Sequence, residues 1–385
     1  MAIYTAYSPT AVTQQELLVK ESVEDLVTNL YPLDTPLHQI LESRPMNSVF
    51  TEQPVDTFNT ITRTSAVFSA SASFGTTHAK PEGFTYATTT PIYQAKLKSV
   101  AEIQGLQFGV SDTDRALSHW GMTDRFAYEA LKCTQSVVNN FEMSFWWSPG
   151  TPAGGADLNS TGGDAIQFAR QTQGLVHWIC KSGLQRSKIG LAQATFTDGH
   201  GNEFGTNSAA LNTGASSWAY DAGGLTLDQA MFKDNLMAQW YTITGRQAGA
   251  VGFTGAKIKN LFSQFALTAN GAINERTLDA ASKRIVDTVD YYETDFGVVS
   301  LNLCRYLNIS GQSVSIAQST GSVTVPYDEV LLFMQPSYFK IGVVRPITMS
   351  PLGKTGDFEQ GLIRGEKGII CTNPQAGAAI VSCIP

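Results

Sequence analysis

Hydrophobic side chains recur at helical spacing between residues 123 and 147. Steps of four and seven place them on one face of a helix: Phe126, Ala130, Val137, Phe141 and Phe145. No glycine or proline interrupts the run, and Ser148-Pro149-Gly150 ends it. Thr123 and Asp124 can cap the first free amides, as Ser111 and Asp112 can for a short turn upstream. Such a helix is roughly 37 Å long, and its periodicity alone predicts an ordinary core helix.

The pattern before this helix has a period of two. Apolar and polar residues alternate weakly from residue 49 and more clearly from 92 to 110. The intervening segment, 59–91, is rich in Ser, Thr and Ala, and its only formal charges are Arg63, Lys80 and Glu82. Two strands joined in this way predict a long hairpin that extends from the body. A loop folded back on its own domain is the alternative.

The first 48 residues predict an arm followed by a short helix. Residues 14–30 have an amphipathic helical pattern that comprises Leu17, Leu18, Val23, Leu26, Val27 and Leu30. Pro32 and Pro36 interrupt it, because proline disfavours helix in the residue before it. Pro36 can itself occupy the first position of the next helical turn.

The remainder of the chain alternates helices and strands. A glycine-rich stretch, 148–224, contains a predicted surface insertion at 198–214. Residues 225–241 predict a second helix that ends at Gly245, and 250–265 predict a strand, a glycine turn and a helix. Further strands are expected at 286–292, 298–303 and 330–334, and the last fifty residues alternate strands with turns. The fold class is therefore α+β, without βαβ repeats.

Composition narrows the functional classes. The chain has 385 residues, enough for two or three domains, and 15% are charged, against a typical share of about 25%. A low charge without disorder-type composition suggests that copies of the chain cover much of the surface. The net charge is −7 and the 26 Lys and Arg are scattered, so no nucleic-acid footprint is seen. No apolar run or leader pattern predicts a membrane partner.

No catalytic constellation emerges. The cysteines form an odd, widely spaced set without CxxC, typical of reduced, isolated thiols: Cys133, Cys180, Cys304, Cys371 and Cys383. Gly353-Lys354-Thr355 is similar to the end of a phosphate-binding loop, but Thr348 stands where that motif needs glycine. The five histidines are scattered. We expect no cofactor and no metal, and a Cys/His hydrolase stays an alternative because such residues can meet in the fold.

The last third of the sequence carries a resemblance. It contains Arg345-Pro346, Pro351-Leu352, Lys354-Thr355-Gly356-Asp357 and Glu359, followed by Glu366 and Asn373. Asp34-Thr35-Pro36-Leu37 lies near the start, and Gly174-Leu175 with Trp178-Ile179 lies in the middle. In this order the chain resembles the major capsid proteins of tailed bacteriophages. The insertion within 198–224 departs from the family pattern.

The resemblance implies a Hong Kong 97-type capsid fold. Its parts would be an N-terminal arm (1–48), an extended β-hairpin loop (49–110) and a peripheral domain (111–224) with a spine helix at 123–147 and the glycine-rich insertion. An axial domain (225–335) and a return to the peripheral domain with a closing strand (336–385) would follow. Trp146-Trp147 would mark the peripheral edge.

The implied function is that of a major capsid protein, not an enzyme. Copies would self-assemble into pentamers and hexamers of an icosahedral or prolate head that encloses double-stranded DNA without sequence-specific binding. Scaffolding, portal and decoration proteins are further candidate partners, and the location would be the virion capsid, assembled in the host cytoplasm. An encapsulin-like nanocompartment shell is the alternative. We predict these intersubunit contacts and no covalent crosslink: Arg63, His78, Lys80, Glu82, Arg276, Arg345 and Asp357.

Overall fold

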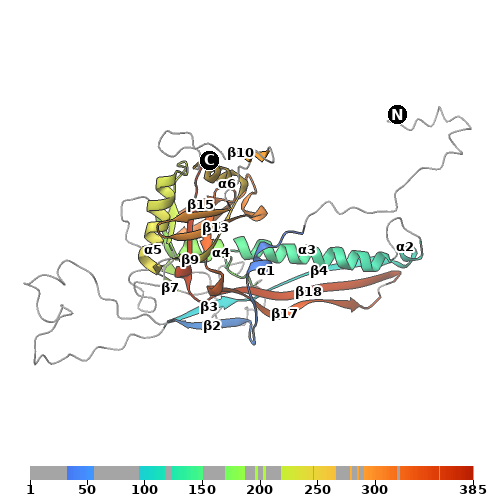
Figure 1. The fold of residues 1–385 in the computed structure, drawn as a ribbon. Coiled ribbons are helices and arrows are strands. Elements are labelled where there is room, and N and C mark those ends of the chain that lie inside the picture. Colours follow the sequence, from blue (N-terminus) through green and yellow to red (C-terminus); the bar gives the residue numbers. More distant parts are fainter. Residues whose placement is uncertain are drawn as a thin grey trace, which may run out of the picture.

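The computed structural model describes most of the chain: residues 33–55, 95–117, 124–150, 170–186, 196–197, 203–204, 218–245, 247–265, 278–279, 284–285, 290–318, 321–354 and 356–384. Two bodies are joined in an elongated molecule (Figure 1). In one, a long helix lies along a four-stranded sheet. The other is built on a seven-stranded sheet. The predicted arm up to residue 32, hairpin tip 59–91 and most of the insertion lie outside the described residues.

The long helix predicted from periodicity is α3 (Arg125–Trp147). The Asp124 carboxylate caps it by accepting hydrogen bonds from the amides of Phe126 (2.9 Å) and Ala127 (3.4 Å). Before it, α2 (Asp112–Ala116) begins at Ser111, whose hydroxyl accepts from the Asp114 amide. Both caps agree with the sequence prediction, since each side chain satisfies amides that lack an intrahelical partner.

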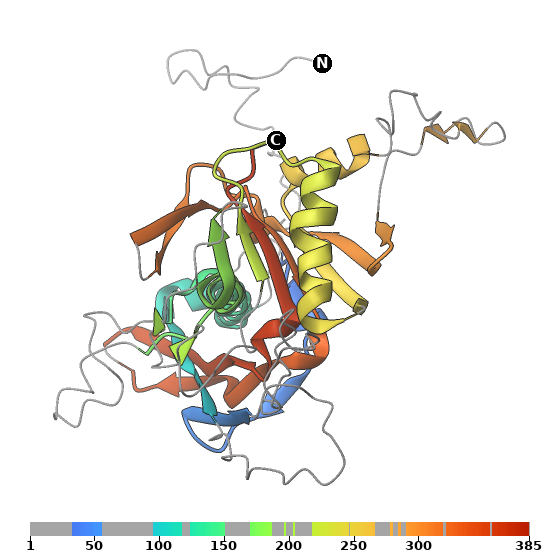
Figure 2. The same cartoon turned by 90° about the vertical axis from the view of Figure 1, so that its left-hand side faces the viewer.

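The four-stranded sheet has the order β1-β17-β18-β4. Its strands are β1 (Ser43–Pro45), β17 (Phe339–Leu352), β18 (Phe358–Cys371) and β4 (Glu102–Ser111). The inner face of α3 packs against β4 and β18 through buried Phe141 and Ile363 and the partly buried Phe126, which lies on Phe108. Figure 2 looks along α3 and shows this sheet to one side. The predicted apolar stripe of the helix thus meets the returning strands.

The base of the predicted hairpin is present as β2 (Phe50–Val55) and β3 (Ala95–Val100), which pair antiparallel. The alternation at 92–110, however, is not one strand. It divides at Ala101, a fully buried residue whose amide donates to the carbonyl of Val49. Beyond it β4 pairs with β18, from Lys367↔Glu102 to Phe358↔Ser111. Residues 102–111, most of which were predicted to be part of the extended loop, therefore belong to the four-stranded sheet.

The seven-stranded sheet has the order β12-β13-β9-β16-β19-β8-β5. These strands are β12 (Tyr291–Thr294), β13 (Gly297–Leu303), β9 (Gln247–Thr254), β16 (Leu331–Met334), β19 (Gly377–Val381), β8 (Trp218–Asp221) and β5 (Leu184–Arg186). The closing strand β19 pairs with β16 and β8. The body built on this sheet also contains the helices α4 (Leu175–Gly183), α5 (Ala238–Thr244) and α6 (Ala256–Phe265).

The second predicted helix departs from regular α geometry. Residues Met231–Met237 form a π-helix, η3, in which the Ala238 amide bonds to the carbonyl of Lys233 before α5 begins. The wider i→i+5 turn brings Phe232 and Met237 to the same side, where both are fully buried. Gly245 ends the helix at φ +78°, as its position in the sequence predicted.

The described part also contains shorter elements: α1 (Pro36–Ile40), β6 (Phe196–Thr197), β7 (Glu203–Phe204), β10 (Leu278–Asp279), β11 (Arg284–Ile285), η5 (Arg305–Leu307), β14 (Ser313–Gln318), β15 (Gly321–Pro326), η6 (Pro336–Tyr338) and η7 (Pro374–Ala376). Pro36 occupies the first turn of α1, as predicted.

The C-terminal end of α3 joins the two bodies. The Trp146 ring meets Phe253 of β9 edge-on at 5.1 Å between centroids. The Trp147 ring stacks on Tyr327 at 3.8 Å, and its Nε1 donates to the carbonyl of Tyr306. The tryptophan pair was expected at the peripheral edge, and that expectation is wrong. Both rings are buried where the helix enters the seven-stranded body, because the aromatic side chains of Phe253 and Tyr327 receive them there.

Candidate functional site

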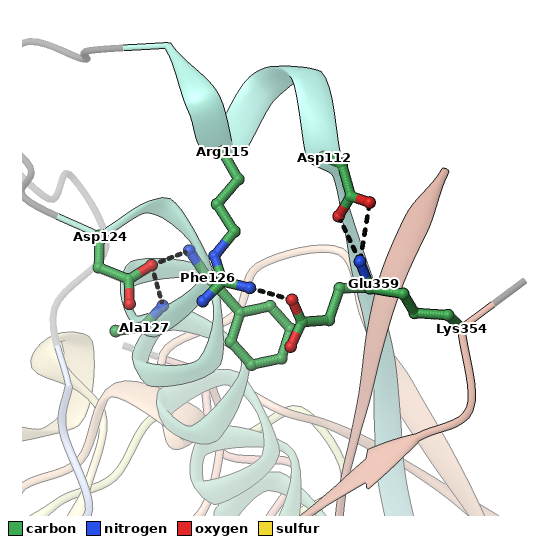
Figure 3. A network of polar contacts seen from close by, with 7 residues as sticks. All are labelled: Asp112, Arg115, Asp124, Phe126, Ala127, Lys354 and Glu359. Carbon is green, nitrogen blue, oxygen red and sulfur yellow. Dashed lines mark hydrogen bonds and ion pairs between the residues drawn. The ribbon is translucent and has the colours of Figure 1, made fainter. Parts of the chain in front are cut away.

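The tip of the four-stranded sheet, at the turn between β17 and β18, is one candidate surface. There the turn between β17 and β18 is held against α2. Lys354 Nζ contacts both carboxylate oxygens of Asp112, at 2.9 and 2.7 Å (Figure 3). The Asp112 amide donates to the carbonyl oxygen of Asp357 (2.9 Å). The hydrogen bond to Asp112 raises the pKa of Lys354, so the amine stays charged. These contacts fix the turn that carries the most specific part of the capsid resemblance.

A second charged pair stabilises the same tip. Arg115 of α2 pairs with Glu359 of β18, and its guanidinium lies 5.9 Å from the centre of the Phe126 ring (Figure 3). Two exposed apolar residues are near this pair in the sequence, Leu117 (61% exposed) and Phe358 (48% exposed). A rigid tip with apolar and charged groups at its surface suits contact with another protein.

Two of the predicted contact residues lie in the described chain, and the structure does not bring them together. Asp357 is at the tip, where its carboxylate accepts from the hydroxyl of Thr113 at 3.4 Å. Arg345 lies further along β17, with Nε 3.1 Å from Glu366, which also binds Arg170 at 2.8 Å. Arg63, His78, Lys80, Glu82 and Arg276 lie outside the described residues.

The anchor of α1 on α3 is a feature that the sequence did not reveal. The carboxylate of Glu142, fully buried, accepts from the Leu37 amide at 2.7 Å and lies 2.5 Å from His38 Nδ1. The His38 ring stacks on Phe145, and its Nε2 is 3.3 Å from Lys367 Nζ. Burial lowers the pKa of Lys367, against the opposing charge of Glu142. The one sequence feature that could have indicated this anchor is Glu142 itself, an acidic residue between the apolar Phe141 and Phe145.

A buried carboxylate also binds the segment 170–173 to the four-stranded sheet. Glu102 of β4 accepts from the Thr172 amide at 3.1 Å and from Gln104 Nε2 at 2.5 Å. Burial raises the pKa of Glu102, although these hydrogen bonds oppose the shift. Thr172 in turn accepts from the Ile369 amide of β18 at 2.9 Å. Glu102 and Thr172 thus link β4, residues 170–173 and β18 through buried hydrogen bonds.

The described residues give little support to a cysteine nucleophile, a phosphate-binding loop or a metal site. Burial raises the pKa of the Cys304 and Cys383 thiols to about 12, so these thiols are not nucleophilic at neutral pH. Gly353 and Lys354 lie at a β-hairpin turn rather than between a strand and a helix, which does not match a phosphate-binding loop. Among the described residues, no group of His, Cys, Asp or Glu is arranged to hold a metal ion. No described helix is long and apolar enough to cross a bilayer.

Solved capsid structures share this architecture. The capsid of a native GTA particle matches with a TM-score of 0.57 at 10% identity, over 98% of this chain and 100% of that chain. The mature capsid of bacteriophage PhiM1 (0.52, 11%, 96% and 93%) and the capsid of Cyanophage P-SCSP1u (0.51, 12%, 97% and 96%) match similarly. At such identities the likeness defines the fold, and the expected Hong Kong 97-type capsid fold is confirmed.

The sequence itself identifies the family to which the chain belongs. Residues 5–383 match the SU10 major capsid protein family, so the chain belongs to this family. The chain is thus a major capsid protein, and this match favours that function over the encapsulin-like alternative. No curated protein is similar enough in sequence to serve as a relative.

Proposed function

We propose that copies of this chain form pentamers and hexamers of a closed head, icosahedral or prolate, that encloses the double-stranded DNA of a tailed bacteriophage. The observation that carries the proposal is the two-stranded β2–β3 sheet. It pairs over six positions, from Phe50↔Val100 to Val55↔Ala95, and has no third strand among the described residues. An isolated two-stranded hairpin is marginally stable in water, so its extension needs another surface on which to lie.

A neighbouring subunit is the partner that fits this need. Residues 59–91, which lie between β2 and β3 in the sequence, are polar and nearly uncharged, so their backbone groups can pair with a neighbour at little desolvation cost. A contact between unlike surfaces, repeated around an axis, closes into rings. We therefore propose that the part of the predicted loop (49–110) between β2 and β3 bridges subunits, and that the arm (1–48), the peripheral domain (111–224, 336–385) and the axial domain (225–335) form the body together with β4.

The charge of the chain supports enclosure of DNA without tight binding. The net charge is −7 and the 26 Lys and Arg are scattered along the sequence, whereas tight phosphate contacts require densely placed cationic side chains. The assembled virion would form in the host cytoplasm, and scaffolding, portal and decoration proteins are the other partner classes such a head would meet. The proposed role is structural rather than catalytic, which the protonated, buried thiols of Cys304 and Cys383 support.

Deletion of residues 59–91, replaced by a short Gly-Ser turn, tests the proposal. We expect a soluble subunit with unchanged far-UV circular dichroism that no longer builds closed shells in electron micrographs. A matched control removes 205–214 of the insertion, which is expected to leave assembly intact. Closed shells formed by the 59–91 deletion would contradict the assignment of the loop.

The charged residues of the loop give a finer test. Arg63→Ala combined with Lys80→Ala is expected to lower particle yield and the melting temperature of particles, because both side chains are proposed to contact neighbours together with His78 and Glu82. Unchanged yield and unchanged melting temperature would exclude these contacts.

A further inference from the structure

An uncovered apolar stripe runs along the outer side of α3. Leu131 is 60% exposed, Ala127 is exposed and Val138 is partly exposed. These three positions are spaced by four and seven residues, so they share one face of the helix. The residues that face the sheet are a different set, which includes Val137 and Phe141. The stripe is thus a second apolar face of the same helix.

This stripe continues a face that is already covered. Four and seven residues beyond Val138 are Glu142 and Phe145, and these are the two residues on which α1 packs. The Leu37 amide binds the Glu142 carboxylate, and the His38 ring stacks on Phe145 at 5.3 Å. The interface of α1 therefore ends where the exposed part of the stripe begins.

The chain that precedes α1 starts beside the stripe. The hydroxyl of Tyr306 lies 3.1 Å from the carbonyl oxygen of Asp34 and 3.4 Å from Asn139 Oδ1. The Tyr306 hydroxyl thus links the backbone at Asp34 to Asn139 of α3, the residue that follows Val138. The residues before Asp34 have only a short distance to travel to the stripe.

We propose that residues 14–30 of the same chain form a helix that docks on Ala127, Leu131 and Val138. Val23, Leu26, Val27 and Leu30 recur at i, i+3, i+4 and i+7, which places them on one apolar face. A 17-residue helix is about 25 Å long and the stripe spans about 17 Å, so one helix covers it.

Charge and burial favour this occupant. The segment carries Glu16, Glu21, Glu24 and Asp25 against Lys20. Lys132, which follows Leu131 of the stripe, is 60% exposed on its side chain and lies 3.7 Å from Glu129. Covering the stripe also removes from water both its own apolar area and that of the segment, at about 25 cal/mol per Å². The docked segment would continue the α1 interface over the full length of α3, and the spine would be covered before any assembly takes place.

The reactivity of an engineered thiol at the stripe tests this docking. In a Cys133→Ser background, Leu131→Cys is labelled with a maleimide in the unassembled full-length chain. We expect labelling at least about tenfold slower than in the same protein with Leu26→Asp and Leu30→Asp, since tenfold corresponds to about 1.4 kcal/mol of docking. Thr28→Asp, on the opposite side of the segment, is the matched control and should leave the protection intact. Asn140→Cys, on an exposed position away from the stripe, should react fast in every variant.

Equal labelling of Leu131→Cys with and without the aspartates would overturn the proposal. A disulfide between Leu26→Cys and Leu131→Cys shows whether the docked segment comes from the same chain or from a second copy. An intramolecular bond, seen as a monomer on a non-reducing gel, supports docking within one chain. Disulfide-linked dimers would instead assign the segment to a second copy and overturn docking within the chain. The readouts need no particles, so failure of this docking is distinguishable from failure of the shell proposal.

Discussion

Replacement of Glu142 by alanine tests how the N-terminal part of the chain is held. The Glu142 side chain is fully buried and is the acceptor for both the Leu37 amide (2.7 Å) and His38 Nδ1 (2.5 Å). Removing it leaves a buried backbone N–H without its acceptor, at about 1–3 kcal/mol, and deletes a second hydrogen bond of similar size. We therefore expect a loss of about 3–5 kcal/mol in the free energy of unfolding, in the range for breaking one side of a buried polar pair.

The conservative variant separates the two bonds. Glu142→Gln keeps an oxygen acceptor for the Leu37 amide and removes the carboxylate from His38, so we expect a smaller loss of about 1–2 kcal/mol. Glu129→Gln is the matched control on the same helix. It removes only ion pairs to Arg125 and Lys132 near the surface, which are worth at most about 1 kcal/mol.

Equilibrium unfolding in urea of the unassembled subunit gives the free energies. Hydrogen exchange at the amides of Leu37 and Gln39 reports α1 separately from the rest of the fold. Glu142→Ala should speed exchange at both amides. If Glu142→Ala unfolds within about 0.5 kcal/mol of the native chain and leaves exchange at Leu37 unchanged, Glu142 does not anchor α1.

Two further predictions concern the interior. At Gly255 a Cβ atom would overlap the backbone carbonyl oxygen of Leu307, so Gly255→Ala should lower the free energy of unfolding in urea by about 1–3 kcal/mol. Gly353 has open space around it, so Gly353→Ala should change stability little. Equal stabilities of the two variants would contradict the packing at Gly255. Burial raises the pKa of Glu102 above its ordinary 4.5, so its contribution is full below pH 4.5 and declines as pH rises through the raised pKa. Glu102→Gln should flatten that decline in unfolding measured from about pH 4 to about pH 7, and an unchanged pH profile would refute it.

The sequence predicted correctly those elements that depend only on residues close together in the chain. The spacing of Phe126, Val137 and Phe141 predicted α3, and Asp124 and Ser111 predicted its cap and that of α2. Hydrophobic period and cap chemistry are local properties, so tertiary contacts did not change them. The order of the capsid-like motifs predicted the fold, which the solved capsid structures confirm.

The features that sequence reasoning missed depend on distant partners. Leu37 and Glu142 are 105 residues apart, and neither residue alone indicates the other. Ala101 divides the strand 92–110 because it is buried against Met46 and Ile370, which alternation cannot show. The Trp146-Trp147 pair is at the centre of the molecule because Phe253 and Tyr327 lie there. Arg345, proposed as an intersubunit contact, also has a partner in its own chain, Glu366.

Electron microscopy of the purified full-length chain is the most direct test of the central claim. The account predicts closed shells whose reconstructed surface shows five-fold and six-fold clusters of subunits, with residues 59–91 of each subunit lying on a neighbour. A chain that stays monomeric at every concentration and salt tested, or shells in which 59–91 contacts only its own subunit, would contradict it.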